Sequence, residues 1–208
     1  MAEHKKNIKQ EHLKSTFESI DKIHPHKMLA YLFIFGSSMV FLFMILAYSV
    51  TETNINNYNM PNAFIISAMI MLVSSFTISK IISAFNAEKI YKVRNALFVT
   101  LILGIGFSVC QYIGWQKLQA LGIFTGGKNE GMYLYVVSGL HLSLFILAVS
   151  FLVVILIESI KVAKDPVKVL IKVTNPYEKV RLQILNDFWQ YLNILWLILF
   201  FYFLYRIN

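Results

Sequence analysis

Residues 132–157 read MYLYVVSGLHLSLFILAVSFLVVILI, a run that contains no Asp, Glu, Lys or Arg. A helix of about 20 apolar residues crosses the hydrocarbon core of a bilayer. Four further stretches have a similar length and character, so that the predicted spans are residues 28–50, 62–85, 96–116, 132–157 and 183–205. The sequence therefore predicts an all-α fold, a polytopic membrane protein organised as a bundle of five transmembrane helices.

The composition of the whole chain agrees with this prediction. The 208 residues are 57% hydrophobic and 14% charged, and the mean hydropathy is +0.61, whereas soluble domains carry about 25% charged residues. The single cysteine, Cys110, lies within a predicted span, so it can form neither an internal disulfide nor a cysteine-rich metal site. These features exclude an ordinary soluble domain and argue against redox chemistry by the chain's own thiols.

Polar segments divide the chain into an N-terminal arm, residues 1–27, and a membrane domain, residues 28–208. The first apolar run is longer than the apolar core of a signal peptide, so we expect it to be retained as the first span. In the arm, Leu13, Phe17 and Ile20 fall on one face of a helix. This spacing leaves open a helix on the membrane surface and a solvated tail.

The distribution of lysine and arginine predicts the orientation. The arm, the second connection and the fourth connection carry six, three and six positive residues, whereas the first connection, the third connection and the C-terminus carry none, two and one. The positive-inside rule then places the N-terminus in the cytoplasm and the C-terminus in the periplasm. Lys80, near the inner end of the second span, can snorkel. The formal charge of +8 is thereby explained by lysine and arginine side chains that face anionic lipid headgroups. We therefore expect no nucleic-acid partner.

The ionisable residues within the predicted spans point to no reactive centre. No carboxylate lies in the middle of a span, and of the five histidines only His141 lies within one. A haem held between helices usually takes two imidazoles, and a metal site needs three or four ligands. We therefore expect no catalytic site, no metal and no cofactor in this chain.

Small and polar side chains recur at helical spacing within the spans. In lipid, small residues let helices approach closely, and hydrogen bonds between polar side chains join them. On spacing alone, a packed bundle with polar contacts explains the pattern. The candidate helix, subunit or lipid contacts are Ser74 and Ser75 in the second span, Gln111 in the third, Ser138 and His141 in the fourth, and Trp189, Gln190, Asn193 and Trp196 in the fifth.

Each predicted span also carries a longer motif. These are LFIFGSSMVFLF at 32–43, PN at 61–62 with SSFT at 74–77, QY at 111–112 with Trp115, LYVVSGLH at 134–141 and FWQYLNILWL at 188–197. In order and spacing they resemble subunit III of the haem-copper cytochrome c oxidase and quinol oxidase family, in its short five-helix form. The most specific stretch is 134–141, which is similar to the family pattern FxxTGxHxxHV.

The chain departs from the family pattern at several polar positions, so it resembles a divergent member. Ser38, a further contact candidate, stands where the family has a glutamate, and Leu144 stands at its second histidine. Gln190 and Asn193 replace a histidine and an aspartate, and the acid of the third span appears as Gly114 or its neighbour. Roles that depend on the family's carboxylates are therefore not carried over.

The resemblance implies a non-catalytic supporting subunit of a respiratory terminal oxidase in the bacterial inner (cytoplasmic) membrane. Subunit I of such a complex carries the haems and copper and reduces oxygen, and subunit III stabilises it, supports its proton uptake and binds phospholipids. Expected partners are subunit I, the other oxidase subunits and membrane lipids, with a respiratory supercomplex as one further association. Two alternatives are an assembly or anchoring subunit of another respiratory complex and a small permease or channel subunit.

Overall fold

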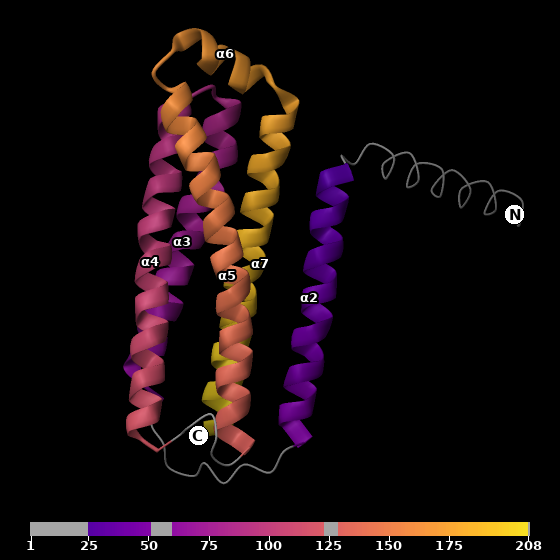
Figure 1. Cartoon of the computed structure of the whole chain (residues 1–208), viewed down its shortest axis with the longest axis vertical. Helices are drawn as coiled ribbons and strands as arrows, with labels where there is room; N and C mark the ends of the chain where they lie inside the picture. Colours follow the sequence, from indigo (N-terminus) through magenta and orange to yellow (C-terminus); the bar gives the residue numbers. More distant parts are fainter. Residues whose placement is uncertain (1–24, 51–59, 123–128, 208) are drawn as a thin grey trace, which may run out of the picture.

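The computed structural model describes residues 25–50, 60–122 and 129–207, and these contain helices and no strand. Figure 1 shows five long helices side by side and a short one across one end. The helices are α2 (Pro25–Val50), α3 (Asn62–Asn86), α4 (Ile90–Ala120), α5 (Asn129–Val162), α6 (Pro166–Thr174) and α7 (Pro176–Ile207). The all-α prediction is confirmed for this part of the chain, while the proposed arm helix at 13–20 lies outside the described residues.

Five of these helices, α2 to α5 and α7, are long and apolar enough to cross a membrane. This agrees with the five predicted spans, and the chain is a multi-pass membrane protein. Several helices are longer than predicted: α4 begins at Ile90 rather than 96, and α7 begins at Pro176 rather than 183. The difference arises because a helix continues into the headgroup region, where its first turns are polar, whereas the prediction followed only the apolar residues.

The connection between the fourth and fifth spans contains a helix that the sequence analysis did not predict. Asp165 precedes α6, and its carboxylate accepts a hydrogen bond from the Val167 amide at 3.0 Å. Asn175 precedes α7 and accepts one from the Tyr177 amide at 3.0 Å. Each of these residues is followed by proline, which is well suited to the first helical position. The two pairs therefore begin new helices as well as ending the preceding ones.

Ion pairs fix α6 against the ends of α5 and α7. The Arg181 guanidinium donates to both carboxylate oxygens of Glu158, at 2.7 and 3.1 Å, and to Glu178 at 3.0 Å. The Lys172 ammonium, on α6, lies 3.1 Å from Glu178 and 3.5 Å from Glu158. We call these four residues the ion-pair clamp. Its two positive and two negative charges balance, and Lys172 is buried among them.

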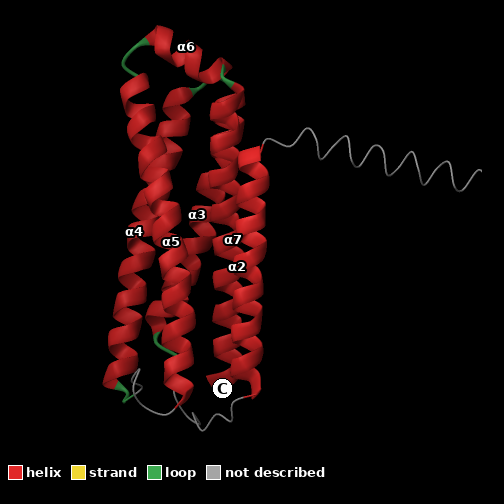
Figure 2. Ribbon diagram, turned by 45° about the vertical axis from the view of Figure 1, so that its right-hand side comes forward, coloured by secondary structure: helices red, strands yellow, loops and turns green. Residues whose placement is uncertain are grey.

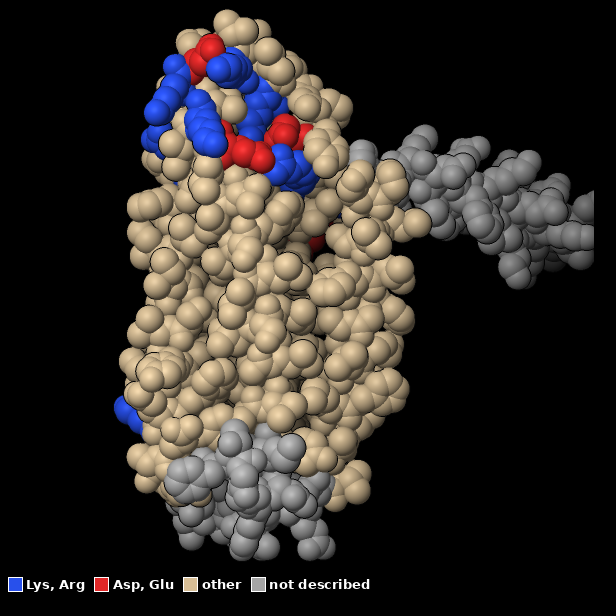
Figure 3. All heavy atoms as spheres, viewed as in Figure 1, with Lys and Arg blue, Asp and Glu red and all other residues tan. Residues whose placement is uncertain are grey.

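One end of the bundle collects the positive charge of the described residues. The start of α2, the turn between α3 and α4, and α6 all lie at this end, which we call the basic end, whereas α7 finishes at the other (Figures 1 and 2). The space-filling view shows lysine and arginine side chains gathered there, interspersed with acidic ones, above a wide band that is almost without charge (Figure 3). The connections predicted to share one side of the membrane therefore do lie together.

Four helices, α3, α4, α5 and α7, enclose the core, and α2 lies beside them against α7 and α5. All residues of α2 are described, and only Phe41 and Tyr48 are buried. A row of hydrogen bonds, which we call the seam, joins α2 to α7. It consists of Lys27 to Gln183 (3.3 Å), Tyr31 to Asp187 (2.9 Å), Ser37 with Tyr191 (3.0 Å) and Ser49 with Tyr202 (2.7 Å). Residue numbers rise together along both helices, so α2 and α7 run parallel.

The ion-pair clamp predicts that Arg181→Gln destabilises the protein. The substitution leaves Glu158 and Glu178 with only Lys172 to compensate them, which we expect to cost about 1 to 3 kcal/mol. Thermal unfolding of the purified protein in detergent measures the loss. Lys168→Gln is the matched control, because its ion pair with Asp165 is exposed on both sides at 3.6 Å and is worth less than about 1 kcal/mol. Equal unfolding temperatures for the two variants would contradict the prediction.

Candidate functional site

The candidate contact residues of the second to fifth spans meet inside the four-helix core. Ser75 and Gln190 are half-buried at its edge, and Ser38 is half-buried on α2. The remaining seven are buried, and we call them the polar core: Ser74, Gln111, Ser138, His141, Trp189, Asn193 and Trp196. The structure thus gathers most of the sequence candidates into one region and leaves Ser38 apart.

Ser74 connects α3 to α7 through Trp189. The indole Nε1 of Trp189 donates to Ser74 Oγ at 3.1 Å, and that hydroxyl donates to the Met71 carbonyl at 2.8 Å. Asn193 Oδ1 lies 3.5 Å from the same hydroxyl, which is a weaker alternative for its one proton. A single serine therefore supplies the acceptor that a buried tryptophan needs and a polar contact between two helices.

Three further hydrogen bonds connect α4 to its neighbours. Gln111 Nε2 donates to Ser67 Oγ on α3 at 3.3 Å. On the α5 side, Trp115 Nε1 donates to Ser138 Oγ at 3.1 Å, and the Tyr135 hydroxyl donates to the Trp115 carbonyl at 3.1 Å. These contacts cross the helix boundaries at different heights, so α4 is held to both α3 and α5.

His141 lies fully buried between α5 and α7. Its Nε2 is 3.1 Å from the Leu192 carbonyl, and a carbonyl can only accept, so Nε2 carries the proton. The ring lies 5.1 Å from Trp196 and 5.8 Å from Phe107, measured between ring centroids. Among the described residues, no group of three His, Cys, Asp or Glu side chains is arranged to hold a metal ion. The geometry gives His141 a contact between helices.

Several atoms of the polar core have no protein partner in the part of the chain that the structure describes. They are Gln111 Oε1, His141 Nδ1, Asn193 Nδ2 and Trp196 Nε1. A buried polar atom without a partner costs about 1 to 3 kcal/mol, and such atoms are commonly satisfied by ordered water. The polar core therefore retains hydrogen-bonding capacity beyond what its helix contacts use.

At the edge of the core, Gln190 bridges α7 to α3. Ser75 Oγ donates to Gln190 Oε1, and Gln190 Nε2 donates to Ser79 Oγ at 2.7 Å. Ser38 behaves differently, because its hydroxyl donates to the Ile34 carbonyl of its own helix at 2.7 Å. The position at which the resembling family has a glutamate is therefore occupied by a residue that bonds within α2.

The sequence analysis missed the seam between α2 and α7. The pattern that could have found it is Gln183, Asp187 and Tyr191, which follow one another at four-residue spacing and so lie on one face of α7. All three take part in the seam. The contact residues predicted in this helix include Trp189, Asn193 and Trp196, which face the core instead.

Gly114 is the small residue on which core packing depends most directly. A Cβ at this position would lie 2.6 Å from Cζ of the Phe64 ring on α3, closer than real contacts allow. Phe64 in turn contacts Trp196, with ring centroids 6.2 Å apart. The position that the resemblance paired with a family acid therefore has no space for any side chain.

Comparison of the sequence with protein-family models and with curated proteins finds no match. The likeness to subunit III accordingly rests on the motifs quoted above, and what it implies for activity and partners is a proposal.

We expect Gly114→Ala to destabilise the bundle by about 1 to 3 kcal/mol, because the added methyl group overpacks the contact with Phe64. Thermal unfolding in detergent provides the measurement. Gly106→Ala on the same helix is the matched control, since its Cβ would meet its nearest neighbour, Ile70, at an ordinary 3.7 Å. The prediction fails if both variants unfold at the wild-type temperature.

We expect Ser74→Ala to cost about 1 to 2 kcal/mol, because it removes the acceptor of the buried Trp189 N–H. The change is measured as a shift in unfolding by sodium dodecyl sulfate in mixed micelles. Ser143→Ala serves as the control, because Ser143 is exposed and its hydroxyl bonds only to Gly139 in its own helix. A control that loses as much stability as Ser74→Ala would assign the effect to the hydroxyl bond that each serine makes within its own helix, and would refute the role of the Trp189 bond.

Proposed function

We propose that this protein is a non-catalytic supporting subunit of a respiratory terminal oxidase, a divergent subunit III that stabilises the haem- and copper-carrying subunit I. The observation that carries the proposal is the convergence of the motif residues. Residues quoted for the resemblance from four separate spans contact one another in the polar core, as with Ser74 and Trp189, or His141 and Trp196. A fold shared with subunit III would bring these motif residues together in this way.

A supporting role fits the way the polar groups are used. The strongest contacts of the core join helix to helix, through Trp189 to Ser74 and through Trp115 to Ser138. Such contacts make the helix bundle rigid in lipid, and we call this bundle the frame. A rigid frame can hold a catalytic neighbouring subunit in place. In this role the redox cofactors belong to subunit I, and support of its proton uptake is indirect.

The outward face of α2 is the part of this frame that we propose for contact with lipid and partner subunits. Large apolar side chains such as Phe35, Phe43 and Leu46 are more than half exposed. An almost wholly apolar groove of about 500 Å³ separates α2 from α5, with Leu32, Phe33 and Leu144 among its walls. Its size and character suit the acyl chains of the phospholipids that the resemblance implies.

The basic end is proposed to face the cytoplasm of a bacterium, with the end of α7 in the periplasm. The support comes from charge: fifteen lysines and arginines belong to the arm and connections of that end, against three at the other. The same excess favours anionic lipid on that side of the inner membrane.

Purification of the tagged protein from native membranes in a mild detergent is the decisive experiment. We expect subunit I to be recovered with it and to contribute haem absorbance to the preparation, because the frame is proposed to hold that subunit. Oxygen consumption by the preparation gives a second readout.

The control for this purification is the pair of glycine variants. Gly114→Ala, which distorts the frame, is expected to recover less haem per mole of tagged protein, and Gly106→Ala is expected to recover the wild-type amount. Recovery without any haem would refute the oxidase proposal. Recovery with subunits of another respiratory complex would favour an anchoring role instead, and solute flux by the reconstituted protein alone would favour a permease.

A further inference from the structure

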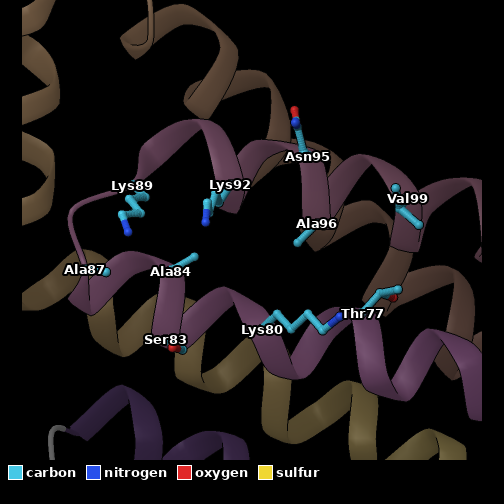
Figure 4. Close-up of a pocket in the computed structure, with 10 residues that line it drawn as sticks. All are labelled: Thr77, Lys80, Ser83, Ala84, Ala87, Lys89, Lys92, Asn95, Ala96 and Val99. Carbon is cyan, nitrogen blue, oxygen red and sulfur yellow. The ribbon is translucent and has the colours of Figure 1, made fainter.

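A pocket of about 480 Å³ lies between the basic-end halves of α3 and α4 (Figure 4). Lys80 extends into it from α3, while Lys89 and Lys92 come from the turn before α4 and its first turn. The ten described residues that line the pocket include these three lysines and no acid. Its walls therefore carry only positive charge.

None of the three lysines is neutralised by a neighbour within the described residues. At the basic end, ion pairs are formed by Lys168, Lys172 and Arg181 instead. The close-up shows Lys89 and Lys92 directed from the α4 side toward α3 (Figure 4). Like charges that share a pocket repel one another, so the arrangement favours a bound anion.

Lys80 lies within the length of α3 rather than at its end. It is six residues from the last residue of α3, or about 9 Å along the helix axis. Side chains lean toward the N-terminus of their helix, and for α3 that end is the one opposite the basic end. Figure 4 accordingly shows Lys80 extending toward Thr77 rather than toward the helix end, which differs from the expected snorkelling. An ammonium so directed within a membrane span requires a counter-ion.

The pocket changes in character along its length. Near the helix ends it offers Lys89 and Lys92, together with hydrogen-bonding groups of Ser83 and Asn95. Further into the span its wall includes Thr77 and Val99, and the Lys80 side chain extends toward Thr77. The beginning of α4 adds the partial positive charge of a helix N-terminus, and its first turn contains no acidic residue to offset it. A positive region at the helix ends that continues into a wall with apolar residues suits the phosphate and the first acyl carbons of an anionic phospholipid.

We propose that this pocket binds one anionic phospholipid, with the phosphate among Lys80, Lys89 and Lys92 and the beginning of an acyl chain along Val99. A soluble phosphate ion meets the same charges, but only a lipid also places acyl carbons against the apolar part of the wall at Val99. The proposal is independent of the oxidase function, because it uses only α3, α4 and their turn.

Native mass spectrometry of the full chain in detergent, titrated with phosphatidylglycerol or phosphatidylcholine of identical acyl chains, tests this site. Each lysine near anionic lipid contributes about fivefold to affinity. We therefore expect the wild type to bind the first phosphatidylglycerol at least about tenfold more tightly than phosphatidylcholine, and K80Q/K89Q/K92Q to lose this preference. All three lysines are exposed, so the variant is expected to fold. If it does not, K89Q/K92Q is used and is expected to lose at least about fivefold.

The matched control is K161Q/K164Q/K179Q, which removes the same charge from the basic end at lysines that do not line the pocket. It is expected to retain the preference within about twofold. An equal loss in both triple variants would show that diffuse charge attracts the lipid, and would overturn the proposal. Sodium phosphate and glycerol 1-phosphate form the second arm. We expect millimolar amounts not to displace the lipid, and displacement would assign the pocket to a soluble phosphate instead.

Discussion

Helices in a bilayer gain little from burying apolar side chains against each other, because the lipid tails they leave are equally apolar. Close packing and hydrogen bonds must therefore hold them together. In this protein α7 takes part in many of these contacts: its Trp189 donates to Ser74 on one side, and its Leu192 carbonyl meets His141 on another. The bundle depends on this helix, because it contacts α2, α3, α5 and α6.

Two kinds of contact result from this dependence. Aromatic rings and a few polar groups of the inner face of α7 pack into the core, where α3 and α4 also approach closely at Phe64 and Gly114. The outer face of α7 holds α2 through the seam, whose bonds include Tyr31 to Asp187. The packed contacts of the core resist any change in side-chain volume. The seam instead depends on separate hydrogen bonds, each of which can break with little effect on the others. The core is therefore rigid, and α2 is its separable neighbour.

The spans could be predicted well from the sequence, because uncharged apolar runs of membrane length are rare outside membrane helices. The buried candidates, such as Gln111 and His141, could be predicted because polar residues within such runs must find partners inside the bundle. The prediction failed for α6, which is nine residues long and is held by ion pairs with residues of α5 and α7. It also failed for the seam and for the space around Gly114, since both depend on which faces of two helices meet, and that is decided only by the assembled bundle.

The parallel seam between α2 and α7 has a consequence for biosynthesis. The span α2 leaves the ribosome some 155 residues before the α7 residues that its hydroxyl groups contact, as the pairs Tyr31–Asp187 and Ser37–Tyr191 record. Until α7 is inserted, Tyr31 and Ser37 must be served by lipid headgroups, by their own backbone or by the insertion machinery. The seam can therefore close only after α7 has been inserted, and a product truncated before α7 lacks this binding surface for α2.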